Sequence, residues 1–89
     1  MIQVGFSSSF NRAYKKLIRN NTDKQKKFSE SLGIFMNDPF HPRLRTHKLT
    51  GQLKNLWSFS VEYDLRVVFY FVADNQVVFE DIGTHDEVY

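Results

Sequence analysis

Three stretches in the second half of the chain carry β-strand patterns, and they restrict the possible folds most strongly. Residues 55–63 alternate, with Trp57, Phe59, Val61 and Tyr63 on one face and Ser58, Ser60 and Glu62 on the other. Residues 64–73 are more continuously apolar, which is typical of a central strand. A tight turn over 73–76 and a last strand over 77–82 follow, so an antiparallel unit is predicted here.

The first half of the chain is mostly helical in its periodicity. Residues 2–6 alternate as a short strand, and apolar residues then recur at helical spacing over 10–18 and 28–36. The "SSS" stretch offers an N-cap to the first helix and Thr22 one to the second, which Pro39 ends. The stretch from Phe40 to Lys54 has no sustained period, and we expect a long ordered loop.

The element order β-α-α-β-β-β predicts an α+β fold with a mainly antiparallel sheet and two N-terminal helices packed on one face. The expected helix-facing side chains of the sheet are Trp57, Phe59, Phe69 and Phe71. A chain of 89 residues with 42% hydrophobic content is expected to form one domain, residues 1–89. It has no cysteine, no leader pattern and no apolar run of membrane-spanning length, which favours a cytoplasmic protein without membrane attachment.

Charge is distributed unevenly along the chain. Residues 1–54 contain eleven of the twelve Lys and Arg and only three acids, whereas residues 55–89 contain one Arg and seven acids. Clustered cations of this kind suit a polyanion such as nucleic acid, although a solvated helix face explains them equally well.

The histidines and one Asp and Arg pair are the candidates for chemistry. His41 precedes Pro42 at a loop corner, where a structural role is the simpler interpretation, while His47 and His85 lie on no apolar face. No His pair has the spacing of a zinc motif and no Cys is present, so we expect no metal site. Asp64 and Arg66 are two residues apart in a predicted strand and therefore share a face.

A buried ion pair, or an Asp64 that caps a turn, explains the presence of Asp64 and Arg66 as well as a catalytic role does. Cleavage of RNA is one such catalysis, because the ribose 2′-hydroxyl is the nucleophile and the protein supplies only a base, an acid and cations. His, Asp, Lys and Arg are sufficient for this reaction, so we expect no cofactor.

The stretches "HKLTGQLKNLWSFSVEYDLRVVFYF" and "IGTHDEVY" resemble the RelE/ParE toxin superfamily, and specifically its RelE-type and YafQ-like members. These proteins are toxins of type II toxin–antitoxin systems, and the likeness spans nearly the whole chain. It implies a small α/β domain with a positively charged groove that cleaves mRNA on the translating ribosome and so inhibits translation. It also implies a cognate antitoxin that folds on binding, in a toxin–antitoxin hetero-oligomer.

The resemblance assigns roles residue by residue. His47 matches the loop histidine of YafQ-like toxins, Asp64 their strand acid and His85 their C-terminal histidine. The implied catalytic residues are His47, Asp64, Arg66 and His85, and Lys54 and Tyr89 match family positions that are expected to bind RNA. Arg43, Arg45 and Lys48, in the basic stretch around His47, complete the expected RNA-binding set. Ser60 stands where YafQ-like toxins have a further histidine, so this chain has one proton-transfer group fewer.

Two other classes remain as alternatives. ParE-type relatives share the fold but bind DNA gyrase and lack the nuclease residues, and other relatives are catalytically inactive. The joint presence of His47, Asp64 and His85 favours the nuclease, because gyrase binding gives no reason for them to converge. A plain nucleic-acid-binding domain is disfavoured by the few exposed aromatics expected in the basic half.

Overall fold

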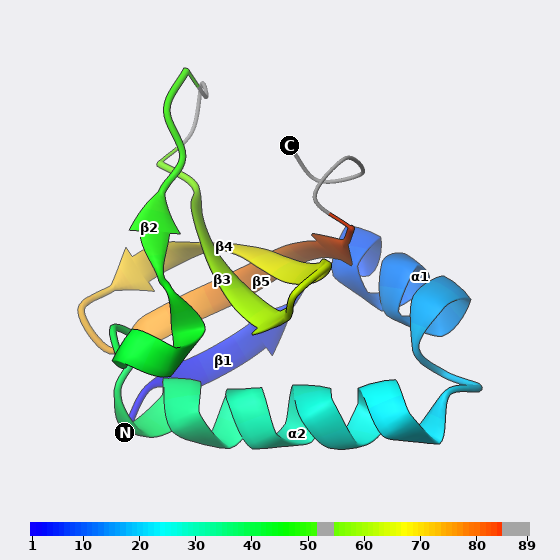
Figure 1. Cartoon of the computed structure of the whole chain (residues 1–89). Helices are drawn as coiled ribbons and strands as arrows, with labels where there is room; N and C mark the ends of the chain where they lie inside the picture. Colours follow the sequence, from blue (N-terminus) through cyan, green and yellow to red (C-terminus); the bar gives the residue numbers. More distant parts are fainter. Residues whose placement is uncertain (52–54, 85–89) are drawn as a thin grey trace.

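The computed structural model describes residues 1–51 and 55–84 (Figure 1). In chain order the elements are β1 (Gln3–Phe6), α1 (Ser8–Leu17), α2 (Thr22–Asn37), the 3₁₀ helix η1 (Pro42–Leu44), β2 (His47–Lys48), β3 (Trp57–Glu62), β4 (Leu65–Ala73) and β5 (Gln76–Gly83). The expected α+β class is confirmed. The expected loop over 40–54 is wrong in part, since it contains η1 and β2, which are too short to produce a visible period.

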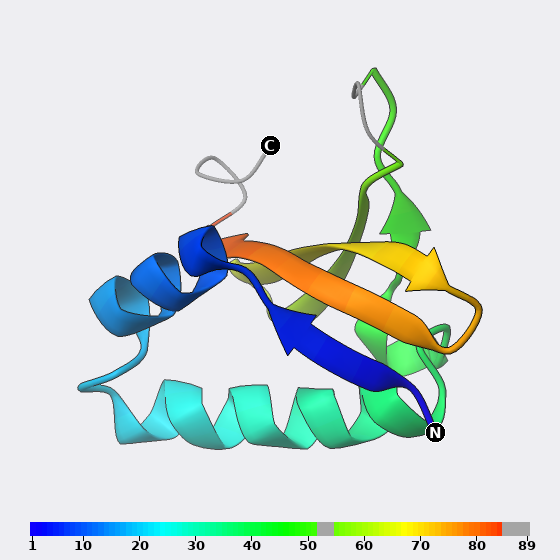
Figure 2. The ribbon, with the colours of Figure 1, turned by 180° about the vertical axis from the view of Figure 1, so that it is seen from behind.

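The five strands form one mixed sheet in the order β1-β5-β4-β3-β2. Neighbouring strands are antiparallel except β1 and β5, which are parallel and pair Gln3 with Gln76 through to Phe6 with Phe79. Figure 2 shows β1 running beside β5, so the first strand of the chain lies against the last one. The pairing of β1 with β5 therefore joins residues that are more than 70 positions apart in the sequence.

Both helices pack on the same face of the sheet (Figure 1). Each helix begins at a side-chain cap. The Phe10 N–H donates to Ser7 Oγ at 3.0 Å at the start of α1, as the "SSS" stretch predicts. The expected Thr22 cap is wrong: the Lys24 N–H donates to Asn21 Oδ1 at 3.0 Å, so Asn21 caps α2. Asparagine is the stronger N-cap of these two adjacent residues, and α2 ends at Asn37, ahead of Pro39.

The core between helices and sheet is built mainly from phenylalanine. The Phe35 ring lies 4.9 Å from both Phe59 and Phe69 and 5.3 Å from Phe79, and all four side chains are fully buried. Trp57 and Phe71 pack at the border of this cluster. The expected helix-facing side chains of β3 and β4 are thus confirmed.

A β-bulge in β3 changes which way its last residues face. Ser60 pairs with Arg66 but Glu62 pairs with Leu65, so Val61 is an extra residue without a partner on β4. Because one inserted residue exchanges the two faces, Glu62 lies on the face of the buried Leu65 rather than on that of Ser60. The predicted strict alternation over 55–63 is therefore wrong at its end, and Tyr63 lies in the turn with 94% of its surface exposed.

Within residues 1–51 and 55–84 there is no helix both long and apolar enough to cross a membrane.

Candidate active site

The segment after α2 brings two arginines to the edge of β3. His41 caps η1, because its Nδ1 accepts a hydrogen bond from the Arg43 N–H at 3.1 Å, and the buried Leu44 anchors η1 in the core. Arg45 follows in the left-handed conformation, with φ 52° and ψ 40°, which residues other than glycine and asparagine rarely adopt. His41 therefore has the structural role expected for it, and Arg43 and Arg45 are exposed on either side of the buried Leu44.

His47 in β2 is held beside Arg45 by a hydrogen bond. Its Nδ1–H donates to the Arg45 carbonyl oxygen at 3.0 Å, since a carbonyl can only accept. In the neutral imidazole this places the proton on Nδ1, which makes Nε2 the basic nitrogen. His47 pairs with Ser58 across β2 and β3, so it lies on the face of the sheet that Ser58 and Ser60 share, opposite the helices.

Arg66 of β4 lies on the same face. Arg66 pairs with Ser60, and its Nη1–H donates to Ser60 Oγ at 2.7 Å. Its Nε is buried and has no acceptor among the residues that the structure describes. A buried guanidinium N–H without an acceptor is uncommon, because it loses its hydration without replacement.

These elements enclose a cavity of about 290 Å³ at the end of the β3–β4 hairpin. The residues that line it are Arg43, Arg45, Ser60, Val61, Glu62, Tyr63 and Arg66. Among residues 1–51 and 55–84, none of the three arginines forms a salt bridge. The cavity thus gathers three guanidinium groups that are not neutralised by a described carboxylate, which is an arrangement that suits a phosphate group.

The one acid that lines the cavity is neutralised from the opposite side. Glu62 Oε1 accepts from Lys24 Nζ at 2.8 Å, and Glu62 Oε2 accepts from Lys27 Nζ at 2.9 Å. These lysine hydrogen bonds lower the pKa of Glu62 below its usual value. The same contact, with a second one to Asp23, raises the pKa of Lys27.

The structure brings together some of the predicted site residues and separates others. Arg43, Arg45 and Arg66 meet at the cavity, and His47 is hydrogen-bonded to one of them. Lys48 is exposed but pairs with Trp57, so it lies on the other face of β2 from His47. The expected placement of Asp64 on the strand is wrong, because it lies exposed in the turn that precedes β4. Lys54, His85 and Tyr89 lie outside the described residues.

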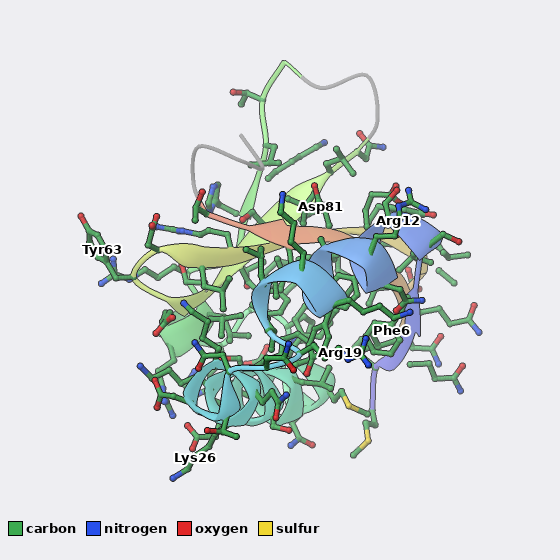
Figure 3. All side chains as sticks on the ribbon, turned by 90° about the vertical axis from the view of Figure 1, so that its right-hand side faces the viewer. Phe6, Arg12, Arg19, Lys26, Tyr63 and Asp81 are labelled. Atoms are coloured by element: carbon green, nitrogen blue, oxygen red, sulfur yellow. The ribbon has the colours of Figure 1, made fainter. Side chains whose placement is uncertain are left out.

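Four residues that line the cavity, namely Ser60, Val61, Glu62 and Tyr63, are not among the predicted site residues. Ser60 was identified only as the position of a missing histidine, whereas it accepts a hydrogen bond from Arg66. Tyr63 was assigned to an apolar face, whereas its side chain points away from the body of the protein at the cavity rim (Figure 3). Nothing in the alternating pattern marks the inserted Val61 that moves Tyr63 into the turn.

No group of three or more His, Asp or Glu that could hold a metal ion occurs in the part of the chain covered by the structure.

Comparison with solved structures places this fold among small bacterial toxins. The chain is similar to the metal-bound toxin from Helicobacter pylori, with 25% identity, a TM-score of 0.80 and full coverage of both chains. It is also similar to YafQ from E. coli strain BL21(DE3), with 20% identity, a TM-score of 0.79 and coverage of 100% of this chain and 99% of that one. YafQ in the E. coli DinJ-YafQ complex gives 22% identity, a TM-score of 0.73 and the same two coverages.

The match of residues 2–89 to a family model, together with the shared fold, defines the class: this is a toxin of the RelE/YafQ-like superfamily. Residues 2–89 match the family described as the bacterial toxin of type II toxin–antitoxin system, YafQ, and the chain belongs to that family. The resemblance inferred from the sequence is thereby confirmed. No curated protein matches the chain.

Proposed function

We propose that this toxin is a ribosome-dependent endoribonuclease that cleaves mRNA and so inhibits translation in the cytoplasm. Membership of the YafQ family supports a toxin. The observation that carries the proposal of RNA cleavage is the cavity lined by Arg43, Arg45 and Arg66, with His47 hydrogen-bonded to Arg45 at its side. Three guanidinium groups and a neighbouring imidazole are the cations and the proton-transfer group that phosphodiester cleavage requires.

The reaction begins when a base removes the proton of the ribose 2′-hydroxyl. The 2′-oxygen then forms a bond to the adjacent phosphorus, the bond from phosphorus to the 5′-oxygen breaks, and an acid donates a proton to that 5′-oxygen. The products are a 2′,3′-cyclic phosphate, which can open to a 3′-phosphate, and a 5′-hydroxyl. Each proton is transferred by a side chain, so the scheme uses no metal ion and no cofactor.

His47 and Asp64 are the two candidates for the base. His47 is favoured, because the hydrogen bond from its Nδ1–H to the Arg45 carbonyl oxygen leaves Nε2 as the nitrogen that can accept a proton. Asp64 is exposed in the turn beside Tyr63, and a carboxylate is intrinsically a weak base. We assign the acid to His85 from its match to the C-terminal histidine of YafQ-like toxins.

The arginines hold the phosphate and stabilise its developing charge. By the sheet register, His47 and Arg66 are two strands apart across the sheet and two residues apart along it. Strand spacings of about 4.8 Å across and about 3.4 Å per residue along the strand put their Cα atoms roughly 12 Å apart. Two long side chains can converge on one phosphodiester over this distance.

The proposed partners are mRNA on the ribosome and a cognate antitoxin protein. A DinJ-YafQ complex is known for the E. coli protein, and we propose an equivalent hetero-oligomer for this toxin. Residues 1–54 provide the cationic surface, with eleven Lys and Arg against three acids, so an acidic or amphipathic antitoxin segment is favoured. Lys48, Lys54 and Tyr89 are proposed to contact RNA as well.

The decisive test is primer extension on mRNA from cells in which the toxin is induced without its antitoxin. We expect discrete cleavage sites with 5′-hydroxyl ends, and a loss of about 10²- to 10⁴-fold in cleavage rate for His47→Ala and for His85→Ala, with RNA affinity nearly unchanged. Replication arrest without mRNA cleavage would instead indicate a gyrase-directed toxin. Full cleavage by folded His85→Ala protein would remove this histidine from the mechanism.

A further inference from the structure

We infer that Lys24 and Lys27 of α2 are positioning residues that hold the Glu62 carboxylate away from the arginine cavity and thereby preserve its affinity for phosphate. This inference rests on the proposed function, since it concerns how the same cavity remains able to bind RNA. Neither lysine lines the cavity, and both act through Glu62.

The β-bulge at Val61 sets the direction of Glu62. In a regular strand, with Val61 paired to Leu65, Glu62 would lie on the same face as Ser60 and Arg66, because residues two apart in a strand share a face. With the bulge, Glu62 pairs with Leu65 and points towards α2. The backbone of the hairpin thus turns an acid away from Arg66 at the position nearest the cavity.

The two lysines complete this separation by occupying both carboxylate oxygens. Lys24 Nζ is 2.8 Å from Oε1 and Lys27 Nζ is 2.9 Å from Oε2, one helical turn apart on the same face of α2. The Glu62 side chain is 24% exposed, so these contacts are partly shielded from solvent. Both acceptor atoms are therefore already used on the helix side of the hairpin.

A released Glu62 carboxylate would compete directly with a phosphate. Glu62 lines the cavity together with Arg43, Arg45 and Arg66, so a carboxylate that is no longer held by the lysines remains beside these guanidinium groups. An arginine and a carboxylate form a strong paired contact of the same kind that an arginine forms with a phosphate. Occupation of one arginine in this way would remove about one phosphate contact from the binding of RNA.

The test compares Lys24→Met/Lys27→Met with a matched control that loses the same charge. Lys16 and Lys26 are exposed on α1 and α2, and Lys26 points away from the sheet (Figure 3), so Lys16→Met/Lys26→Met is the control. The probe is a single-stranded RNA oligonucleotide with 2′-O-methyl riboses, which lack the attacking hydroxyl. We expect the Lys24→Met/Lys27→Met protein to bind about three- to tenfold more weakly than the control, and its plot of log affinity against log salt to be shallower by about 0.7.

Adding Glu62→Gln distinguishes positioning from a purely structural role. Glu62→Gln breaks the same ion pairs but releases no carboxylate. The triple variant Lys24→Met/Lys27→Met/Glu62→Gln should therefore regain the RNA affinity and the salt slope of the Lys16→Met/Lys26→Met control. A structural role would instead make Glu62→Gln alone as harmful as the double lysine variant. Equal binding by the double variant and the control, or failure of Glu62→Gln to restore binding in a folded triple variant, would overturn the inference.

Measuring Arg43→Met in parallel separates this inference from the proposed function. If Arg43→Met binds the oligonucleotide as tightly as the unaltered protein, the cavity is not the phosphate site. Both the proposed function of the cavity and the positioning role of the lysines would then be refuted. If Arg43→Met weakens binding while Lys24→Met/Lys27→Met does not, only the positioning role fails.

Discussion

Replacing Arg66 with methionine should leave the free energy of unfolding nearly unchanged but strongly reduce the action of the protein on RNA. Arg66 Nη1–H donates to Ser60 Oγ at 2.7 Å, a charged hydrogen bond that contributes about 1.5–3 kcal/mol. Its buried Nε lacks an acceptor among the described residues, which costs about 1–3 kcal/mol. These opposing terms nearly cancel, and methionine retains most of the aliphatic packing. We therefore expect the free energy of unfolding of Arg66→Met to lie within about 1 kcal/mol of that of the unaltered protein.

The effect on RNA should be much larger. Loss of one preorganised donor to the reacting phosphate typically slows an enzyme about 10²- to 10³-fold, which corresponds to about 3–4 kcal/mol of transition-state stabilisation. Urea unfolding gives the stability, and cleavage of a reporter mRNA in a translation extract gives the rate. Arg12→Met is the control, because Arg12 also donates to a serine, Ser9, at 3.3 Å, but on the exposed face of α1 (Figure 3).

The opposite pattern would refute this reasoning. If Arg66 were the structural half of a buried ion pair, its removal would destabilise the protein by about 3–5 kcal/mol, because a buried partner charge would be left uncompensated. A loss of that size together with unchanged cleavage would show that Arg66 maintains the hairpin and does not contact RNA.

Four other changes have expected outcomes. Phe69→Ala should lower the free energy of unfolding by about 3–5 kcal/mol in a urea titration, whereas Val72→Ala, at an exposed position of the same strand, should change it by less than about 0.5 kcal/mol. Arg45→Gly should slow cleavage about 10²-fold and change the free energy of unfolding by no more than about 1 kcal/mol. Glycine relieves the backbone strain at φ 52°, but it also makes the unfolded chain more flexible, and these two effects oppose each other. Strong destabilisation by Arg45→Gly would contradict this expectation. The exposed Tyr63 ring is expected to stack on an RNA base, so Tyr63→Ala should weaken RNA binding by about 1–3 kcal/mol and Tyr63→Phe should not. Equal affinities of Tyr63→Ala and Tyr63→Phe in a filter-binding assay would exclude stacking. The pKa of Glu62 is lowered in the folded protein, so its ion pairs stabilise the protein at pH values above the unfolded pKa of about 4.5. The difference in thermal midpoint between the unaltered protein and Glu62→Gln should therefore disappear as the pH falls below that value.

The fold was predictable where a local pattern decides it. The alternation around Trp57 and Phe59, the apolar run of β4 and the helical spacing of α2 each reflect one period and one buried face, and the structure confirms them. A Ser-rich stretch before α1 likewise predicted its cap. The parallel pairing of β1 with β5 could not be predicted in this way, because no local pattern carries information on strands at opposite ends of the chain.

The candidate site was less predictable, because its geometry depends on departures from regular structure. The bulge at Val61 and the left-handed Arg45 have no signature in a two-residue or helical period, and together they decide where Glu62 and Arg45 point. Residue type alone did identify Arg43, Arg45, His47 and Arg66 as candidates, and the structure places the three arginines around one cavity with the histidine beside Arg45. The roles of His85, Tyr89 and Lys54 stay predictions from the family resemblance.

The position of β5 between β1 and β4 also affects when the toxin can become active during its own synthesis. Phe79 of β5 contacts Phe10, Phe28 and Phe35, and the Ser7 N–H donates to the Phe79 carbonyl oxygen at 3.0 Å. The aromatic faces of both helices therefore stay incompletely buried, and β1 has no neighbouring strand, until residues 76–83 have left the ribosome. Chains that close such distant contacts fold late and cooperatively. A growing chain accordingly lacks the assembled sheet that positions Arg66 until its last strand has emerged from the ribosome.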